Sequence, residues 1–389
     1  LGLGAFTEWN EYYTYASQKN NVLFATHLEP SGARLIFPCF DEPRMKATFS
    51  LDYLIVQHSR AEELTALFNS EIMSKTVLEK DIVQFQFEAT PPMSTYLLAL
   101  VVGILPKKVT AETDHGTHVT VWNPKAQPDL ARYLADCVTF LEDAFRFKMP
   151  LKKIDVVYLT FKGENGSMSM ENWGLITTQT TSKFLLLHEL MHYWFGNLVT
   201  CHTWADIFVN EGLGSFYMET FTTNLTGQPN SFTLDGHKNV MKQDRNREFS
   251  PIMSLDNQED QNQNPWSSQY QKAPQILRML EAVVGQKVLL DAARSYLDRY
   301  QYKTAKVMDF IAEVQKAVDK VDNPSWWYVP LFLKCPTDEP SDGQTNGSRS
   351  HLAAILSPES ETELYDLPCA LNRKTLDPEF FAYAHFYFQ

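Results

Sequence analysis

The feature that most constrains this chain is a pair of histidines, His188 and His192, set four positions apart in the segment HELMH. On a helix, residues four apart share one face, so both imidazoles can reach a single metal ion. Leucines precede the segment and a Trp-Phe pair follows it, which predicts a buried helix. Polar side chains in a buried helix need partners. The pattern therefore favours a core helix that carries a metal site over the alternative, a surface helix whose histidines bind nothing.

Two carboxylates complete a zinc site of the hydrolytic kind. Glu211 stands at the start of the next predicted helix, where it can serve as a third ligand; alone, it would be an acidic residue favoured by the helix dipole. Two histidines and a carboxylate suit Zn²⁺, which lowers the pKa of a bound water to about 7. Glu189, directly after His188, lies beside the open coordination position and can pass a proton from the attacking water to a leaving amine. The sequence thus predicts one zinc ion and a proton-transferring glutamate.

Length and charge narrow the class of protein. The chain has 389 residues, enough for two or three domains with cores. Its formal net charge of −13 argues against a nucleic-acid partner, which would need a basic face. Five cysteines form no CxxC pair, so they predict neither a disulfide framework nor a cysteine metal site. No apolar run is long enough to span a membrane, and sequons at Asn165, Asn224 and Asn346 point toward a secreted or cell-surface location.

Hydrophobic periodicity divides the chain into three parts and indicates an α+β fold. In residues 1–121 apolar and polar residues alternate, as at Val83 and Phe85, which predicts a partial N-terminal β-sandwich. Residues 122–322 show helical spacing and form the expected catalytic domain. Residues 323–389 include a loop-like stretch and form an unassigned fragment. A strand is expected at 154–161, and helices are expected at 129–147, 185–197, 211–223, 274–284, 288–300 and 304–321.

Together these motifs resemble the gluzincin aminopeptidases, the zinc enzymes that include aminopeptidase N and the puromycin-sensitive aminopeptidase. The family pattern is HExxH, eighteen residues and Glu, which residues 188–192 and Glu211 fit. The flanks YWFGNLVT and NEGLGSFYME agree as well, as do FPCFDEP at 37–43 and MSTYLLA at 93–99. The resemblance covers roughly residues 20–320. It implies a β domain followed by a thermolysin-like, mostly helical catalytic domain, in which the two histidines and the glutamate hold one zinc ion.

The resemblance also implies a substrate-binding strand and a second catalytic residue. The family's GxMEN motif corresponds to residues 168–172, so Glu171 would bind the free α-amine of a substrate and measure one residue from its N-terminus. Ser169, in the same motif, is expected to contact substrate. Tyr270 precedes a lysine and an LRML helix, as the family's catalytic tyrosine does, and its phenol would donate a hydrogen bond to the oxyanion of the tetrahedral intermediate. Without the resemblance, Glu171 would be a solvated strand-end carboxylate and Tyr270 a packing residue.

Two positions depart from the family at the expected substrate site. Met168 stands where the family has Gly in GxMEN, close to the substrate, so its side chain would narrow the cleft or shift the strand. His27 stands where relatives carry Gln, Glu or Asp at the subsite for the N-terminus, and an imidazole is a poor partner for an ammonium. We therefore expect a preference for small or slender N-terminal side chains, and a loss of activity as His27 becomes protonated.

The leading interpretation is a zinc aminopeptidase that removes N-terminal residues from peptides. Two alternatives stay open: a weak or inactive homologue kept for binding or for a surface role, which Met168 and His27 favour, and a thermolysin-like endopeptidase, which Glu171 disfavours. Peptides are the expected partners, and nucleic acids are not. The abrupt opening LGLGAFTEWN indicates a missing upstream part, so a membrane anchor would lie outside this chain. Relatives include ectoenzymes and cytosolic enzymes, so the compartment stays open, as does the oligomeric state.

Overall fold

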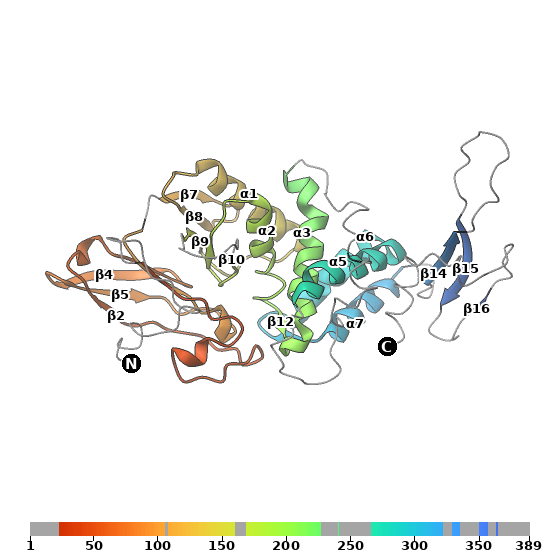
Figure 1. Cartoon of the computed structure of the whole chain (residues 1–389), viewed down its shortest axis with the longest axis horizontal. Helices are drawn as coiled ribbons and strands as arrows, with labels where there is room; N and C mark the ends of the chain where they lie inside the picture. Colours follow the sequence, from red (N-terminus) through yellow and green to blue (C-terminus); the bar gives the residue numbers. More distant parts are fainter. Residues whose placement is uncertain are drawn as a thin grey trace.

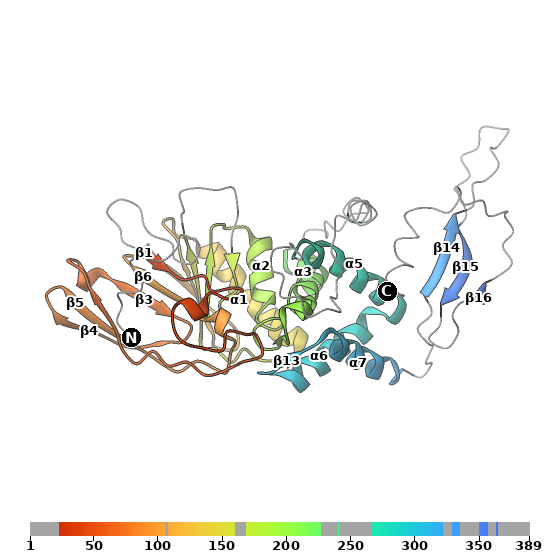
Figure 2. The same ribbon diagram turned by 60° about the horizontal axis from the view of Figure 1, so that its bottom comes forward.

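Strands gather at one end of the molecule and helices in its middle (Figure 1). The computed structural model describes residues 23–105, 108–159, 169–226, 240, 266–321, 329–334, 350–356 and 363–364. The strands of the N-terminal region, drawn in red and orange, lie beside the yellow and green segments that carry the metal-binding motif. Further helices follow in cyan and blue, with a small sheet beyond them (Figure 2).

The N-terminal region forms two three-stranded antiparallel sheets, with the orders β1-β6-β3 and β2-β5-β4. Their strands are β1 Leu23–Ala25, β2 Leu54–Gln57, β3 Thr65–Phe68, β4 Ile72–Glu79, β5 Ile82–Phe87 and β6 Leu100–Gly103, and short 3-10 helices lie at Ala33–Leu35, Ala61–Glu63 and Thr95–Leu97. Inward side chains of both sheets, among them Leu54 and Phe68, share one apolar cluster. The predicted alternation is confirmed in β5, where Val83 and Phe85 are buried and their neighbours are partly exposed.

A five-stranded mixed sheet follows, with the order β10-β11-β9-β8-β7. Its strands are β7 Lys108–Glu112, β8 His118–Trp122, β9 Lys153–Tyr158, β10 Ser169–Met170 and β11 Leu175–Thr178, and β8, β9 and β11 run parallel. Helix α1, Pro128–Phe145, supplies the crossover that the parallel pair β8 and β9 requires. β7 and most of β8 precede the boundary expected at residue 121, yet both belong to this sheet. We therefore propose that the domain boundary lies between β6 and β7.

The remaining helices form the region between this sheet and the C-terminal strands. They are α2 Lys183–Met191, α3 Glu211–Thr226, α5 Trp266–Val284, α6 Gln286–Tyr300 and α7 Val307–Val318, with a 3-10 helix at Trp204–Val209 and a parallel strand pair, β12 Thr200–Cys201 and β13 Thr304–Ala305. α3 packs against α2 and α5, and α6 packs against α7. Each predicted helix is present, although α2 ends well before residue 197, and the segment expected to begin a helix at 304 starts as β13.

The start of α5 differs from the prediction. The expected helix began at residue 274, whereas α5 begins at Trp266 and contains Pro274 in its interior. A proline removes one helical hydrogen bond and crowds the preceding turn. Packing offsets that loss, because Ala273 and Leu277 on either side of it are buried in the main core. Tyr270 consequently lies on the helix itself rather than in a loop before it.

A small antiparallel sheet lies within the unassigned fragment 323–389. Its strands are β14 Val329–Lys334, β15 Ser350–Leu356 and β16 Glu363–Leu364, in the order β14-β15-β16. Figure 2 shows this sheet apart from the helical region. Among the described residues, no helix combines the length and apolar character needed to cross a membrane.

Candidate active site

Helix α2 lies in the core along most of its length. The hydroxyl of Ser182, at its N-terminus, accepts a hydrogen bond from the main-chain N–H of Leu185 at 3.5 Å. Residues 186–191 are all buried, so the apolar side chains pack on several sides of the helix rather than along one stripe. His188 and His192 project from the same face, with ring centroids 4.4 Å apart. The predicted common face of the two imidazoles is therefore present.

Three ligand atoms converge where α2 meets the start of α3. The Nε2 atoms of His188 and His192 lie 2.9 Å apart, and Oε2 of Glu211 lies 3.4 and 3.3 Å from them. Nδ1 of His192 lies 3.0 Å from the carbonyl oxygen of Phe195, and donating there directs the lone pair of Nε2 toward the other two ligand atoms. Two imidazole nitrogens and a carboxylate oxygen around one point are a donor set that fits zinc.

Charge interactions within this triad are strong. Burial alone would raise the pKa of Glu211, but the adjacent His192 and His188 hold it below its usual range. Burial, and then the neighbouring His192, lowers the pKa of His188. Burial also opposes the charge of His192, but Glu211 and Glu171 outweigh it and raise the pKa of that imidazole well above its usual value. Glu211 therefore stays a carboxylate at neutral pH, the form in which it can bind a cation.

Glycines allow α3 to approach its neighbours closely. A Cβ on Gly214 would lie 3.3 Å from the imidazole of His192, and a Cβ on Gly212 would lie 2.9 Å from the Cβ of Ala273. Any larger residue would push α3 away from α2 or from α5. The two glycines thus explain how Glu211, at the first turn of α3, reaches the two histidines.

A further group of carboxylates meets beside the triad. Carboxylate oxygens of Glu29, Glu171 and Glu211 all lie within 4.8 Å of one another. Glu29 comes from the N-terminal region after β1, and Glu171 from the turn after β10. Among the described residues, Oε1 of Glu29 and Oε1 of Glu171 are buried without a hydrogen-bond partner. Buried polar atoms of this kind call for a partner, which a bound cationic group, a water molecule or a shared proton can supply.

Burial is the main reason that the pKa values of Glu29, Glu171 and Glu189 are raised. It raises the pKa of Glu29 well above its usual value, and the charges of Glu171 and Glu211 raise it further. Burial likewise raises the pKa of Glu171, against the opposing effect of His192. The pKa of Glu189 is raised well above its usual value by burial and by Glu171. Four carboxylates in one buried site favour a positively charged ligand.

Glu29 is the site residue that sequence reasoning missed. The sequence assigned the subsite for the substrate N-terminus to His27, two positions earlier. Within the described residues, the carboxylate cluster includes Glu29 and not His27. Burial lowers the pKa of His27 to about 4, so its imidazole is neutral at neutral pH. The sequence offered no local signal for Glu29, because it lies in a turn after β1 rather than in a strand with a regular alternation of faces.

The turn that carries Glu171 is fixed by contacts from two regions. Nδ2 of Asn69, at the end of β3, donates to the carbonyl oxygen of Trp173 at 2.8 Å. The main-chain N–H of Gly174 donates to the hydroxyl of Tyr193 at 2.9 Å. Gly174 has φ +83°, and a Cβ there would lie 2.2 Å from the carbonyl oxygen of Asn69, so only glycine fits. The N-terminal region therefore packs directly on this turn.

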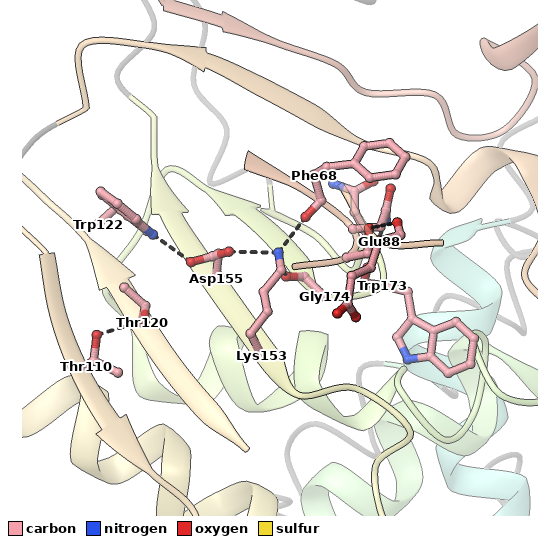
Figure 3. Close-up of polar contacts among 12 residues, drawn as sticks. Phe68, Glu88, Thr110, Thr120, Trp122, Lys153, Asp155, Trp173 and Gly174 are labelled. Atoms are coloured by element: carbon pink, nitrogen blue, oxygen red, sulfur yellow. Dashed lines mark hydrogen bonds and ion pairs between the residues drawn. The ribbon is translucent and has the colours of Figure 1, made fainter. Parts of the chain in front are cut away.

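Lys153 adds further contacts between the N-terminal region and the turn that carries Glu171 (Figure 3). Its Nζ donates to the carbonyl oxygens of Phe68 and Gly174 at 2.5 and 2.9 Å, and to Oδ2 of Asp155 at 2.7 Å. Nε1 of Trp122 donates to the other carboxylate oxygen of Asp155 at 2.8 Å, which links β8 to β9. Because Phe68 ends β3 and Gly174 precedes β11, the lysine joins the N-terminal sheet β1-β6-β3 to the five-stranded sheet.

Tyr270 faces the triad from the first turns of α5. Its ring centroid lies 5.7 Å from that of His188. Burial of the hydroxyl, and then the charges of Glu211 and Glu29, raise the pKa of Tyr270 well above its usual value. The phenol is therefore protonated at neutral pH and can donate a hydrogen bond. Tyr270 as a whole is 41% exposed, so it stands at an open side of an otherwise buried site.

The structure separates the predicted site residues into four groups, of which His27, outside the carboxylate cluster, is one. Those that it brings together are His188, Glu189, His192, Glu211, Glu171 and Tyr270. Ser169 lies on β10 two residues before Glu171, and its Oγ lies 2.8 Å from Oγ1 of Thr178 across the sheet, so its hydroxyl is engaged within the protein. Met168 lies outside the described residues.

Two domain families match this chain. The Peptidase family M1 domain matches residues 131–326, and the Peptidase M1 N-terminal domain matches residues 3–97. The first match contains the metal triad, Glu171 and Tyr270, and the second contains Glu29. The residues that meet in the site are thus divided between both domains.

Three curated relatives show the same similarity. Endoplasmic reticulum aminopeptidase 1 of Mus musculus is 28% identical over 392 aligned positions, covering 94% of this chain and 39% of the relative. Glutamyl aminopeptidase of Homo sapiens is 30% identical over 330 positions, which cover 78% of this chain and 33% of the relative. Puromycin-sensitive aminopeptidase of Caenorhabditis elegans is 31% identical over 334 positions, which cover 79% of this chain and 34% of the relative. This chain thus spans between a third and two fifths of the length of these relatives. On the match of its two domains, the chain belongs to peptidase family M1.

Proposed function

We propose that this chain carries the active site of a zinc aminopeptidase, which removes N-terminal residues from peptides. The observation that supports this most is the pair of buried carboxylate oxygens on Glu29 and Glu171, which lack a partner among the described residues and lie beside the metal triad. A free α-amine is the charged group that every peptide N-terminus offers to such a pair. The relatives named above as aminopeptidases support the same proposal.

The triad of His188, His192 and Glu211 would hold one zinc ion. When bound, zinc lowers the pKa of a water molecule to about 7 and polarises a substrate carbonyl. Glu189 follows the first ligand on α2, and burial raises its pKa, which makes it a better acceptor for a proton. It would accept the proton of the attacking water and deliver it to the leaving amine.

Glu29 and Glu171 would bind the substrate's ammonium group from two sides. Charge-assisted hydrogen bonds to both carboxylates would satisfy their free oxygens and reduce the repulsion between them. Because both residues are fixed beside the triad, the amine would be held at one distance from the scissile carbonyl, which limits cleavage to the first peptide bond. Acetylation of the amine removes the charge and leaves two buried carboxylates unpaired.

Tyr270 would act at the other side of the scissile bond. Its protonated phenol can donate a hydrogen bond to the oxyanion that forms when water attacks the carbonyl. Its position on α5, close to His188, is compatible with that role. Ser169 and Met168 stay predicted substrate contacts, the first through its main chain because its hydroxyl is engaged by Thr178.

The test compares one peptide with its N-acetylated form, on zinc-loaded protein and on the Glu189→Gln variant. Release of the N-terminal residue from the free peptide alone, with no release by the variant, is the expected result. Equal cleavage of both peptides would replace the proposal with an endopeptidase. Cleavage of neither peptide by protein with a full equivalent of zinc would identify an inactive homologue.

A further inference from the structure

Two side chains, those of Tyr193 and Asn197, connect the metal-binding segment to the turn that carries Glu171, and only Asn197 contacts Glu171 itself. The main-chain N–H of Asn197, in the turn after α2, donates to the carbonyl oxygen of His192 at 2.9 Å. The side-chain Nδ2 of the same residue donates to the carbonyl oxygen of Glu171 at 2.8 Å. Asn197 is fully buried. A metal ligand and an amine-binding carboxylate are therefore held through one residue.

Side chains of the N-terminal region donate hydrogen bonds to the turn that contains Asn197. Nζ of Lys46 donates to the carbonyl oxygens of Asn197 and Leu198 at 2.9 and 3.1 Å. The hydroxyl of Tyr96 donates to the carbonyl oxygen of Gly196 at 3.3 Å. Burial lowers the pKa of Lys46 to about 7, and its Nζ can donate hydrogen bonds in either protonation state. Two hydrogen bonds from one Nζ to neighbouring carbonyls constrain where that turn lies.

The turn does not depend on the Asn197 side chain for its fold. Its main chain has its own hydrogen bonds: the N–H of Gly196 donates to the carbonyl of Val199, and the N–H of Leu198 to that of Tyr193, at 2.8 and 3.1 Å. The Asn197 amide therefore adds a contact between two segments rather than closing the turn. Its remaining effect is on the position of Glu171 relative to the helix.

We propose that Asn197 is a positioning residue that sets the distance between Glu171 and the metal triad, and that Lys46 holds Asn197 in place. The inference rests on the proposed aminopeptidase function, in which that distance decides which bond is cleaved. A misplacement of about 1 Å between a binding group and a reacting centre can lower a rate by roughly 10²-fold. We therefore expect the loss of this buried hydrogen bond to weaken recognition of the amine.

The first experiment measures binding without turnover. In the Glu189→Gln background, the Kd of a free-amine peptide and of its acetylated form is measured by titration calorimetry, with Asn197→Ala or Lys46→Met added. We expect Asn197→Ala to weaken binding of the free peptide about tenfold, in line with a loss of roughly 1.4 kcal/mol for one buried hydrogen bond, and to leave the acetylated peptide unchanged. Lys46→Met should act in the same direction. Zinc content should stay at the parent level.

Lys75 provides a matched control. Its Nζ also donates to two main-chain carbonyls, those of Glu62 and Leu64, both at 2.7 Å, but within the N-terminal sheets. Lys75→Met removes the same type of contact away from the site and should leave both Kd values unchanged. If Lys46→Met and Asn197→Ala behave as Lys75→Met does, the proposal is wrong.

A double-mutant cycle separates positioning from general stability. If Asn197 acts through Glu171, adding Asn197→Ala to Glu171→Ala should weaken binding no further. An equal loss in both backgrounds would overturn the proposal, as would a loss of affinity that merely follows a loss of zinc. Asn197→Ser replaces Asn197→Ala if the latter does not fold. A parent protein that binds free and acetylated peptides equally would refute the aminopeptidase function itself, and this inference with it.

Discussion

The carboxylates of Glu29 and Glu171 lie within 4.8 Å of each other, although they belong to different regions of the chain. Glu29 follows β1 in the N-terminal region, and Glu171 follows β10 in the five-stranded sheet. Two buried like charges at this distance repel each other, so the arrangement is stable only with a compensating cation or a shared proton. The pairing makes the N-terminal region part of the candidate substrate site.

Replacing either carboxylate should weaken recognition of free amines. Glu29→Gln and Glu171→Gln each remove one charge with little change in shape. We expect each to lower kcat/KM for an amino-acid amide by about 10²-fold or more, because breaking a buried charge pair costs roughly 3–5 kcal/mol. Glu79→Gln, at an exposed end of β4, is the control and should change nothing. A Glu29→Gln enzyme indistinguishable from this control would remove Glu29 from the amine subsite.

The metal triad should bind one equivalent of zinc. His188→Ala and Glu211→Gln each remove one of three ligands, and we expect both to lose most of the metal after dialysis, measured by elemental analysis. His118→Ala, at an exposed position on β8, should keep the full equivalent. Less than about a tenth of an equivalent in the reconstituted parent would reject the site, since three such ligands hold zinc tightly.

Glu189→Gln should separate chemistry from metal binding. The amide cannot accept the proton of the attacking water, so we expect turnover to fall by about 10²–10⁴-fold. Zinc content should equal that of the parent, because Glu189 is not one of the three ligands that meet on α2 and α3. Turnover that survives in this variant would assign the proton transfer to another group.

Tyr270→Phe should act on the rate more than on binding. The lost hydrogen bond matters when negative charge forms on the carbonyl oxygen, so we expect kcat to fall by roughly 10²–10³-fold while KM changes little. Tyr133→Phe removes the same hydroxyl from α1, outside the triad, and serves as the control that should leave kcat unchanged. An unchanged kcat in Tyr270→Phe would mean that a different tyrosine faces the oxyanion.

Local patterns predicted the metal triad because its information is local. His188 and His192 are one helical turn apart, so a buried helix alone brings them together. Glu211 needed the family spacing as well, and its approach depends on Gly214, which allows α3 to pack against a histidine ring. Glu29 could not be found in this way, because its neighbours along the chain do not show that it meets a turn from the other region.

The partners of strands were the least predictable part of the fold. Val119 and Val121 are the buried positions of β8, but such an alternation does not say which strand lies alongside. β8 pairs with β9 across the α1 crossover, so it belongs to the five-stranded sheet. The early start of α5 was missed because proline is typical of the first turn of a helix, so the helix was expected to begin at Pro274. Tertiary packing overrides that tendency, and α5 begins at Trp266.

The pH response attributed to His27 should appear in stability rather than in activity near neutral pH. Burial lowers the pKa of His27 to about 4 in the folded protein, against about 6.5 in an unfolded chain. Above pH 6.5 the imidazole is neutral in both states and has no effect. Between pH 6.5 and 4 only the unfolded state binds the proton, so stability falls as the pH falls through this window.

His27→Gln should therefore make the protein more resistant to acid. The variant lacks the titrating group, and it should lose up to about 3 kcal/mol less stability than the parent between pH 6.5 and 4, at about 1.4 kcal/mol per pKa unit. Urea midpoints at pH 7.5, 5.5 and 4.5 measure this, with the exposed His118→Gln as control. The ratio of parent to variant activity should stay constant from pH 6 to 8, because His27 is neutral throughout that range. A ratio that changes with a midpoint near 6.5 would show that His27 titrates as an exposed imidazole and that the sequence-based expectation of protonation at the substrate site was right.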